Sequence, residues 1–425
     1  MTIRMPVGIL RRSTRPRRLR RWLWLLRDVF FLSADSVVIL WAGLAAARPA
    51  ADARPKLAIV AAHGLGDLVL LQGVLDELMR PYRRAGWHIT LVCLTRALDY
   101  AETYIGTDAV VAVDRIGMRR NLPARLRVIN YLARASFAAA IQPNYNRELI
   151  IEDALVRATR AAERTGSHGT PQFISARQRR IGDRWYTHLV PTSERLMHDL
   201  ERNGEFVRNL SSASVGIVRP RIAPPAHAPI VVKPPYLLFA VGASSPLKMW
   251  PMHNFVWLAR ALAERGAPKP VFCAGLADWV DKIALEQLAP AEAIDLLGRT
   301  TLTELIALIS QAQLVVTNDS GAVHLAAALA VPVVCIAGGG IVGRYVPYPA
   351  AEAADTDPVT VMVDQSMDCF DCGWRCRFDL REGAPAPCVE RVQCERVLTA
   401  VVDQLGRSAA SYGRGREPRA LSTSP

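Results

Sequence analysis

Short apolar runs that alternate with helical segments are the feature that most limits how this chain can fold. The run LAIVAAH (57–63) is followed by a glycine turn, a segment with helical spacing of apolar residues at 68–86, and a second apolar run at 87–94. A run of this length bounded by glycines is typical of a parallel strand buried on both faces. The body of the chain therefore opens with a strand–turn–helix–strand unit.

Two series of such units occur. Further strands are expected at 108–114 and 137–143, whereas 158–200 looks polar and irregular. A second series has expected strands at 236–244, 270–275, 314–319 and 331–339, and helices at 251–267, 278–289, 301–312 and 320–330. The pattern predicts an α/β protein with two facing Rossmann-like, doubly wound domains. Ligands of such sheets bind beyond the carboxyl ends of the strands, so a site is expected in a cleft between the domains.

The proline-rich segment RPRIAPPAHAPIVVKPP divides the two series, because proline stiffens a chain and removes hydrogen-bond donors. We expect five segments. They are a basic and apolar arm (1–53), an N-terminal domain (54–218), a linker (219–235), a C-terminal domain (236–405) and a disordered tail (406–425).

The arm holds much of the positive charge. The formal net charge is +13, and residues 1–27 contain nine arginines and no acid, so the remainder is only mildly basic. No motif for nucleic-acid binding accompanies this charge, and no nucleic-acid partner is expected. The apolar stretch 29–47 could be a signal sequence, a membrane span, or an arm that packs on the protein or stays disordered. We favour a helix lying on the anionic inner face of a membrane, with the protein cytoplasmic and peripheral.

Three motifs can carry chemistry. Asp67 follows Gly64 and Gly66 at the first strand–helix junction, where a carboxylate can cap the helix or act as a general base. Lys248 follows Ser244 and Ser245 after a strand, and could stabilise a departing diphosphate or be an ordinary loop lysine.

The third motif is LVVTNDSGAVHLAAAL (314–329), in which a buried strand leads into a helix. The helix start would offer free N–H groups to an anion. Ser320 could equally be a simple N-cap and His324 a satisfied core histidine. The candidate ligand contacts here are Asn318, Asp319, Ser320, Gly321 and His324.

Together the motifs H-x-L-G-D-L-V-L, G-A-S-S-P-x-K-x-W-P and V-T-N-D-S-G-A-V-H-L-A-A-A-L-x-V-P resemble glycosyltransferase family 9, the lipopolysaccharide heptosyltransferases, over residues 56 to about 400. The resemblance implies a GT-B fold and metal-independent, inverting transfer of heptose from ADP-heptose. It implies that Asp67 is the catalytic base, that Lys248 stabilises the departing ADP, and that the glycines, serines and 318–324 residues named above bind the nucleotide sugar. For the ribose contact, Asp278 is the candidate.

Five cysteines cluster near the C-terminus, at positions 369, 372, 376, 388 and 394. Their first spacings resemble those of metal sites, so a structural metal is one interpretation and free thiols the other. No metal or other cofactor is expected for the chemistry itself.

The sequence thus predicts a glycosyltransferase whose partners are a nucleotide-diphosphate sugar, a lipid-linked saccharide such as lipopolysaccharide core, and an anionic membrane surface. The alternatives are a transferase of the same fold with another nucleotide sugar or acceptor, such as an O-chain or a protein, and a non-catalytic, membrane-associated assembly protein.

Overall fold

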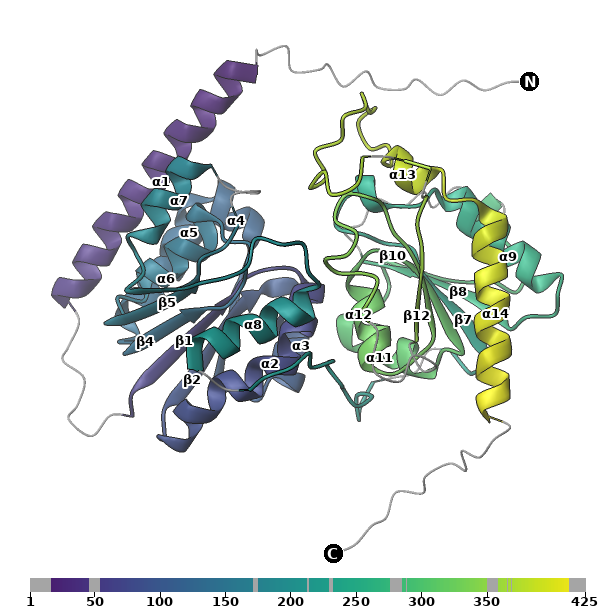
Figure 1. Cartoon of the computed structure of the whole chain (residues 1–425), viewed down its shortest axis with the longest axis horizontal. Helices are drawn as coiled ribbons and strands as arrows, with labels where there is room; N and C mark the ends of the chain where they lie inside the picture. The colour runs from purple at the N-terminus through teal and green to yellow at the C-terminus, as the bar shows by residue number, and fades with distance from the viewer. Residues whose placement is uncertain are drawn as a thin grey trace, which may run out of the picture.

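The computed structural model describes residues 17–45, 54–170, 175–211, 214–228, 232–275, 285–287, 289–349, 358–364, 366–367 and 369–412. Two parallel six-stranded sheets form the centres of two domains (Figure 1). The first sheet consists of β1 (Lys56–Ala61), β2 (His88–Leu94), β3 (Ala109–Val113), β4 (Ala139–Gln142), β5 (Glu163–Ser167) and β6 (His188–Val190). The second consists of β7 (Tyr236–Ala240), β8 (Lys269–Ala274), β9 (Ile294–Leu297), β10 (Leu314–Asn318), β11 (Val333–Ile336) and β12 (Val359–Met362).

Both sheets have the doubly wound strand order. The first runs β3-β2-β1-β4-β5-β6 and the second β12-β11-β10-β7-β8-β9, which is the same order counted from the first strand of each domain. The order reverses between β1 and β4 in one sheet and between β7 and β10 in the other. Ligands of doubly wound folds bind at such reversal points. The expected α/β class with two Rossmann-like domains is confirmed.

Helices cover both sheets. The N-terminal domain has α1 (Arg17–Ala45), α2 (Leu65–Arg84), α3 (Leu98–Tyr104), α4 (Arg115–Arg120), α5 (Leu122–Arg134), α6 (Ala154–Ala158), α7 (Ala176–Asp183) and α8 (Asp199–Ser211). The C-terminal domain has α9 (Met252–Ala263), α11 (Leu302–Gln311), α12 (Gly321–Ala328), α13 (Pro387–Glu390) and α14 (Cys394–Tyr412).

The central strands are almost fully buried, as their apolar sequences predict. In β1 and β7, for example, Ile59 and Leu238 have no solvent exposure. One hydrophobic cluster includes residues of the first sheet and of α2 and α8. The same cluster continues into α12 and the second sheet. The two domains therefore share part of their core.

Two expectations need correction. Residues 158–200 are not irregular, because they include β6, an edge strand of the first sheet, and β5 next to it. The sequence ERTGS of β5 is polar and its first residue is exposed, so it lacks the apolar signature of a central strand. The edge strands β9 and β12 of the second sheet were also not predicted.

The second correction concerns the tail. Helix α14 continues beyond Gly406 to Tyr412, so residues 406–412 are helical and not disordered. The helix is anchored upstream by the buried residues Val397 and Val401, and Ala409 and Ala410 then favour its continuation. Residues 413–425, and most of the helix expected at 278–289 with Asp278, lie outside the described residues.

The basic arm is a helix over much of its length. Helix α1 lies at the outer edge of the N-terminal domain, alongside α5 (Figure 1). Residues 1–16 and 46–53 of the arm lie outside the described part of the chain.

Candidate functional site

The fold brings the three sequence motifs to the reversal points of the two sheets. Asp67 lies in the first turn of α2, directly after β1. Lys248 ends a short 3-10 turn after β7, and Ser320 caps α12 directly after β10. Because β1, β7 and β10 each border a reversal point, all three motifs occupy the position where doubly wound domains bind ligands.

Contacts between the starts of α2 and α12 bring the two domains together. A Cβ atom on Gly66 would lie 2.6 Å from Cδ2 of His324, and one on Gly321 would lie 3.2 Å from Cδ2 of Leu65. A side chain on Gly66 would therefore push the two helix starts apart. Both glycines thus serve close approach of the domains, whatever they contribute to ligand binding.

Asp67 does not occupy the capping position that the sequence left open. Gly64 is the N-cap residue of α2 and, having no side chain, makes no side-chain cap hydrogen bond. Instead Oδ1 of Asp67 accepts a hydrogen bond of 3.0 Å from the hydroxyl of Tyr345, in the other domain. Burial raises the pKa of Tyr345, which keeps this hydroxyl protonated and able to donate. The carboxylate therefore faces the C-terminal domain.

Lys248 reaches the same region from the second domain. Its Nζ lies 3.0 Å from Oδ2 of Asp319, and the side chains of this pair are largely buried. The ammonium also lies over the rings of Trp374 and Tyr345, at 5.2 and 5.9 Å from their centroids. Aromatic faces and one carboxylate thus surround a cation that could contact a phosphate.

The neighbouring serines differ in their surroundings. Ser244 is exposed, whereas the hydroxyl of Ser245 accepts a hydrogen bond from the backbone of Leu247 and so caps the turn that carries Lys248. Ser320 caps α12 by accepting from the backbone N–H of Ala322. The N-cap interpretation of Ser320 is therefore confirmed, and the free N–H groups of the helix start remain next to it.

The expectation that the Asn318 side chain contacts a ligand needs a correction. Its side chain is fully buried, its Oδ1 accepts from the backbone of Trp250 at 2.8 Å, and its Nδ2 donates to the carbonyl of Val241 at 2.7 Å. Both ends of the amide are thus bonded to backbone of the loop after β7. Asn318 fixes the position of that loop and does not face a ligand.

His324 is buried and neutral. Burial lowers its pKa to about 4, and its Nδ1 lies 2.8 Å from the hydroxyl of Tyr348. Its ring packs against Gly66, as described above. These contacts agree with the core interpretation of His324, which shapes the contact between the domains, and a contact of His324 with a nucleotide sugar stays a prediction.

The sequence did not indicate a second set of residues that joins the domains. Nε of Arg344 lies 3.0 Å from Oδ1 of Asp199 at the start of α8, and the backbone N–H of Asp199 donates to the carbonyl of Arg344 at 2.7 Å. His198 lies 2.6 Å from the carbonyl of Tyr345 through Nε2. These residues hold the loop after β11 against the first domain and so place Tyr345 beside Asp67. The glycine-rich run at 338–343 before them is the sequence signal that could have indicated a loop of this kind.

A charged network lies on the other side of Asp67, within the N-terminal domain. His63 at the end of β1 contacts Asn144 at 2.7 Å and Glu152 at 3.4 Å. Nη1 of Arg115 donates to Glu152 at 3.3 Å. Burial lowers the pKa of His63 and raises that of Glu152 to about 8. A neutral histidine, a weak acid and an arginine therefore border the first-domain side of the site.

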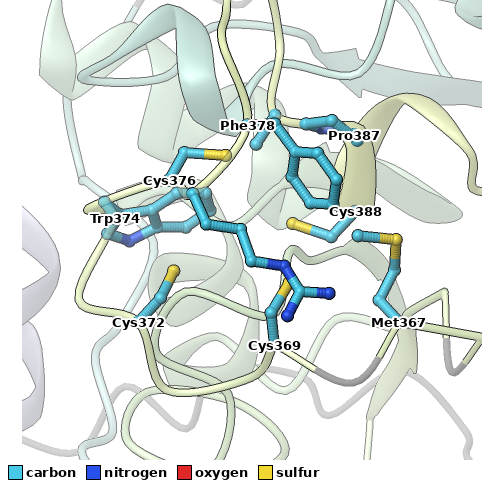
Figure 2. Close-up of a pocket in the computed structure, with 10 residues that line it drawn as sticks. Met367, Cys369, Cys372, Trp374, Cys376, Phe378, Pro387 and Cys388 are labelled. Atoms are coloured by element: carbon cyan, nitrogen blue, oxygen red, sulfur yellow. The ribbon is translucent and has the colours of Figure 1, made fainter.

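The cysteine cluster surrounds an apolar cavity near α13. Its lining includes Cys369, Cys372, Cys376 and Cys388, together with Trp374, the residue that also contacts Lys248 (Figure 2). The fifth cysteine of the cluster instead begins α14. Burial raises the pKa of Cys388, and the other three thiols of the cavity raise it further. Among the residues that the structure describes, no group of three or more His, Cys, Asp or Glu side chains is arranged to hold a metal ion.

A structural metal at this cavity stays a prediction. Four cysteines from one segment match the ligand chemistry of zinc or iron. Elemental analysis of protein purified without an affinity metal decides between the two interpretations: about one equivalent of metal per chain, the content of one four-cysteine site, would indicate a structural metal. If a metal is bound there, Cys372→Ser should lose it, whereas Cys93→Ser, at a buried thiol of β2, should keep it. A metal-free wild-type protein would show that the thiols are free.

A comparison with known protein families found a match for the central part of the chain. Residues 146–353 match the family model described as "Glycosyltransferase family 9 (heptosyltransferase)". These residues include Lys248 and the β10–α12 motif. This region belongs to glycosyltransferase family 9.

Characterised relatives agree with family 9 over shorter stretches. Lipooligosaccharide heptosyltransferase 2 of Haemophilus influenzae is 34% identical over 109 residues, which are 24% of this chain and 31% of the relative. Lipopolysaccharide heptosyltransferase 2 of Escherichia coli K12 is 33% identical over 108 residues, again 24% of this chain and 31% of the relative. The matched stretch thus spans less than a third of these relatives' length.

Solved structures extend the likeness to most of the chain. A glycosyltransferase family 9 protein from Veillonella parvula has a TM-score of 0.58 at 20% identity, covering 83% of this chain and 97% of its own. The E. coli ADP-heptose heptosyltransferase II has a TM-score of 0.53 at 15% identity, covering 83% and 99%. At these identities the likeness concerns the fold, and it confirms the expected GT-B arrangement.

Proposed function

We propose that this protein is an inverting glycosyltransferase that moves a heptose, or a related sugar, from ADP-heptose to a lipopolysaccharide core acceptor. The family 9 region and the relatives named as heptosyltransferases support this proposal. A solved structure of similar fold was determined with ADP-2-deoxy-2-fluoro heptose, which supports the choice of donor. The observation that carries the proposal is the meeting of Asp67, Lys248 and the α12 start between the two reversal points.

Asp67 is proposed as the general base. Its carboxylate points across the domain boundary, where Tyr345 now donates to it. An acceptor hydroxyl that takes the place of the tyrosine hydroxyl would present its proton to the same oxygen. Asp67 would take this proton as the acceptor oxygen forms its bond to the anomeric carbon of the sugar.

Lys248 and the start of α12 are proposed to stabilise the leaving group. When the bond between the anomeric carbon and the phosphate oxygen breaks, its electron pair goes to the nucleoside diphosphate, which gains negative charge. A lysine and free N–H groups at a helix start oppose that charge. Asp319 holds the Lys248 ammonium in place at 3.0 Å. Attack from the face opposite the leaving diphosphate gives inversion, and no step requires a metal.

Binding and turnover of nucleotides test this proposal. Isothermal titration of the full chain is expected to show ADP binding more tightly than UDP or GDP, and Lys248→Ala should weaken ADP binding, because it removes the ammonium near the diphosphate. Incubation with ADP-heptose and a core acceptor should release ADP. Tighter binding of UDP or GDP would make the donor assignment wrong, and a chain that neither binds nor turns over any of these nucleotides would make the transferase assignment wrong.

A further inference from the structure

Helix α1 exposes its most apolar face to solvent. Seven large apolar side chains follow one another along this face, each between 55% and 85% exposed. We call them the outer strip: Leu26, Val29, Phe30, Val37, Leu40, Trp41 and Leu44. Their positions are related by steps of three, four or seven residues, which places them on one side of the helix, with the exposed Ser33 between Phe30 and Val37. Contiguous apolar patches of this kind on a protein surface mark a binding surface.

The opposite face of α1 is fixed to the N-terminal domain. Phe31, Asp35 and Ala42 are buried there, and Nε of Arg125 on α5 donates to Oδ1 of Asp35 at 2.8 Å. A second guanidinium nitrogen of Arg125 bonds to the other carboxylate oxygen. Both side chains of this pair are almost completely inaccessible to solvent. The pair therefore determines which face of α1 turns inward and which turns outward.

Two smaller contacts fix the helix along its length. Arg157 donates to the hydroxyl of Ser36 at 2.8 Å. Near the end of the helix, a Cβ on Gly43 would lie 2.9 Å from a guanidinium nitrogen of Arg160. The glycine allows the helix to lie close against the domain there. The outer strip is thus presented by a docked helix.

The sequence of α1 adds positive charge at the N-terminal end of the helix. The helix begins RRLRR, with no acid in its first turn, and residues 1–27 contain nine arginines. A run of arginines followed by a helix with exposed tryptophan and leucine is the composition of helices that lie in the headgroup region of anionic bilayers. Charge complementarity thus favours an anionic lipid surface as the occupant of the outer strip.

We propose that α1 binds an anionic membrane with its axis in the membrane plane, the outer strip entering the acyl boundary while Asp35 and Arg125 keep the helix on the protein. The segment Leu26–Ala45 is long and apolar enough to cross a membrane. Crossing would, however, pull Asp35 away from Arg125 and place one charge in lipid and the other unpaired in the protein core. The docked pair therefore favours a helix that lies on the membrane.

Binding to vesicles tests this proposal without any substrate, so its outcome is independent of the proposed enzyme activity. The full chain is expected to sediment with vesicles of phosphatidylglycerol and phosphatidylethanolamine in equal parts, and to bind vesicles of phosphatidylcholine more weakly. The triple variant Leu40→Gln, Trp41→Gln and Leu44→Gln should reduce partitioning by about tenfold or more, because it removes apolar area from the inserted face. These side chains are exposed, so the fold should persist, which circular dichroism would verify.

A matched control substitutes exposed apolar residues elsewhere. Ile116→Gln, Trp257→Gln and Val402→Gln lie on α4, α9 and α14 and should leave partitioning unchanged. Substituting the arginines at 17, 18, 20 and 21 with glutamine should remove the preference for phosphatidylglycerol.

Three results would overturn the proposal. The first is a triple variant that binds vesicles as well as the wild type. The second is a wild type that ignores vesicles but forms a dimer that the triple variant breaks, since the outer strip would then be an interface between copies. The third is a protein that resists alkaline carbonate extraction from cell membranes, since α1 would then span the bilayer.

Discussion

Asp67→Asn is expected to lower the rate of sugar transfer by about 10²- to 10⁴-fold, the usual contribution of a general base. This corresponds to roughly 3–5.5 kcal/mol of transition-state stabilisation. Asparagine has nearly the same shape and can still accept from the Tyr345 hydroxyl. It cannot take the acceptor proton, so the loss should appear in kcat with little change in ADP affinity.

A matched control for this substitution lies on the same helix. The side chain of Asp76 on α2 is 79% exposed and pairs with Arg83, away from Tyr345. Asp76→Asn should retain wild-type transfer activity and thermal stability. Should Asp67→Asn turn over ADP-heptose at the wild-type rate while folding normally, Asp67 would not be the base.

Arg125→Met is expected to reduce the free energy of unfolding by about 3–5 kcal/mol, the usual cost of leaving one member of a buried ion pair without its partner. Arg125 has no exposed surface, and its guanidinium bonds to Asp35 and to the carbonyls of Met118 and Ile150 at 2.9 and 2.7 Å. Methionine fills similar volume but leaves the Asp35 carboxylate buried and the two carbonyls unsatisfied. Urea unfolding of the full chain measures the change.

Arg127→Met, at an exposed position on the same helix, is the matched control and should change stability by less than about 0.5 kcal/mol. The double variant Asp35→Leu, Arg125→Met should recover part of the loss, because no unpaired charge then remains. If Arg125→Met were as stable as the control, the Asp35–Arg125 pair would not hold α1 on the domain.

The sequence predicted the interior strands because their surroundings are uniform. Strands such as β1 and β10 are buried on both faces, so almost every residue is apolar and the run stands out from its neighbours. The strands that were not predicted lie at or next to a sheet edge. β6, β9 and β12 are edge strands with a partner on one side only, and β5 pairs with β4 and with the three-residue strand β6. Part of their surface is exposed, so their composition overlaps with that of loops, and only pairing with an existing sheet makes them strands.

The candidate site likewise contains residues that the sequence predicted and residues that it did not. Asp67, Lys248 and Ser320 could be predicted because each follows a recognisable strand, and in a doubly wound sheet that position alone brings them to the ligand-binding edge. Tyr345, Trp374 and Asp199 could not be predicted. They belong to loops or helix starts whose positions depend on the contact between the two domains. No local sequence pattern predicts that contact.

For the arm, the sequence determined that residues 17–45 favour a helix with arginines at one end and apolar residues along it. Which face would be covered depended on a partner 90 positions away, Arg125, whose side chain bonds to Asp35 in the core of the first domain. Apolar residues lie on both sides of this helix, so hydrophobic spacing left its orientation open. The buried ion pair decided it, because a charge can leave water only where its counter-charge is already placed, and that placement exists only in the tertiary structure.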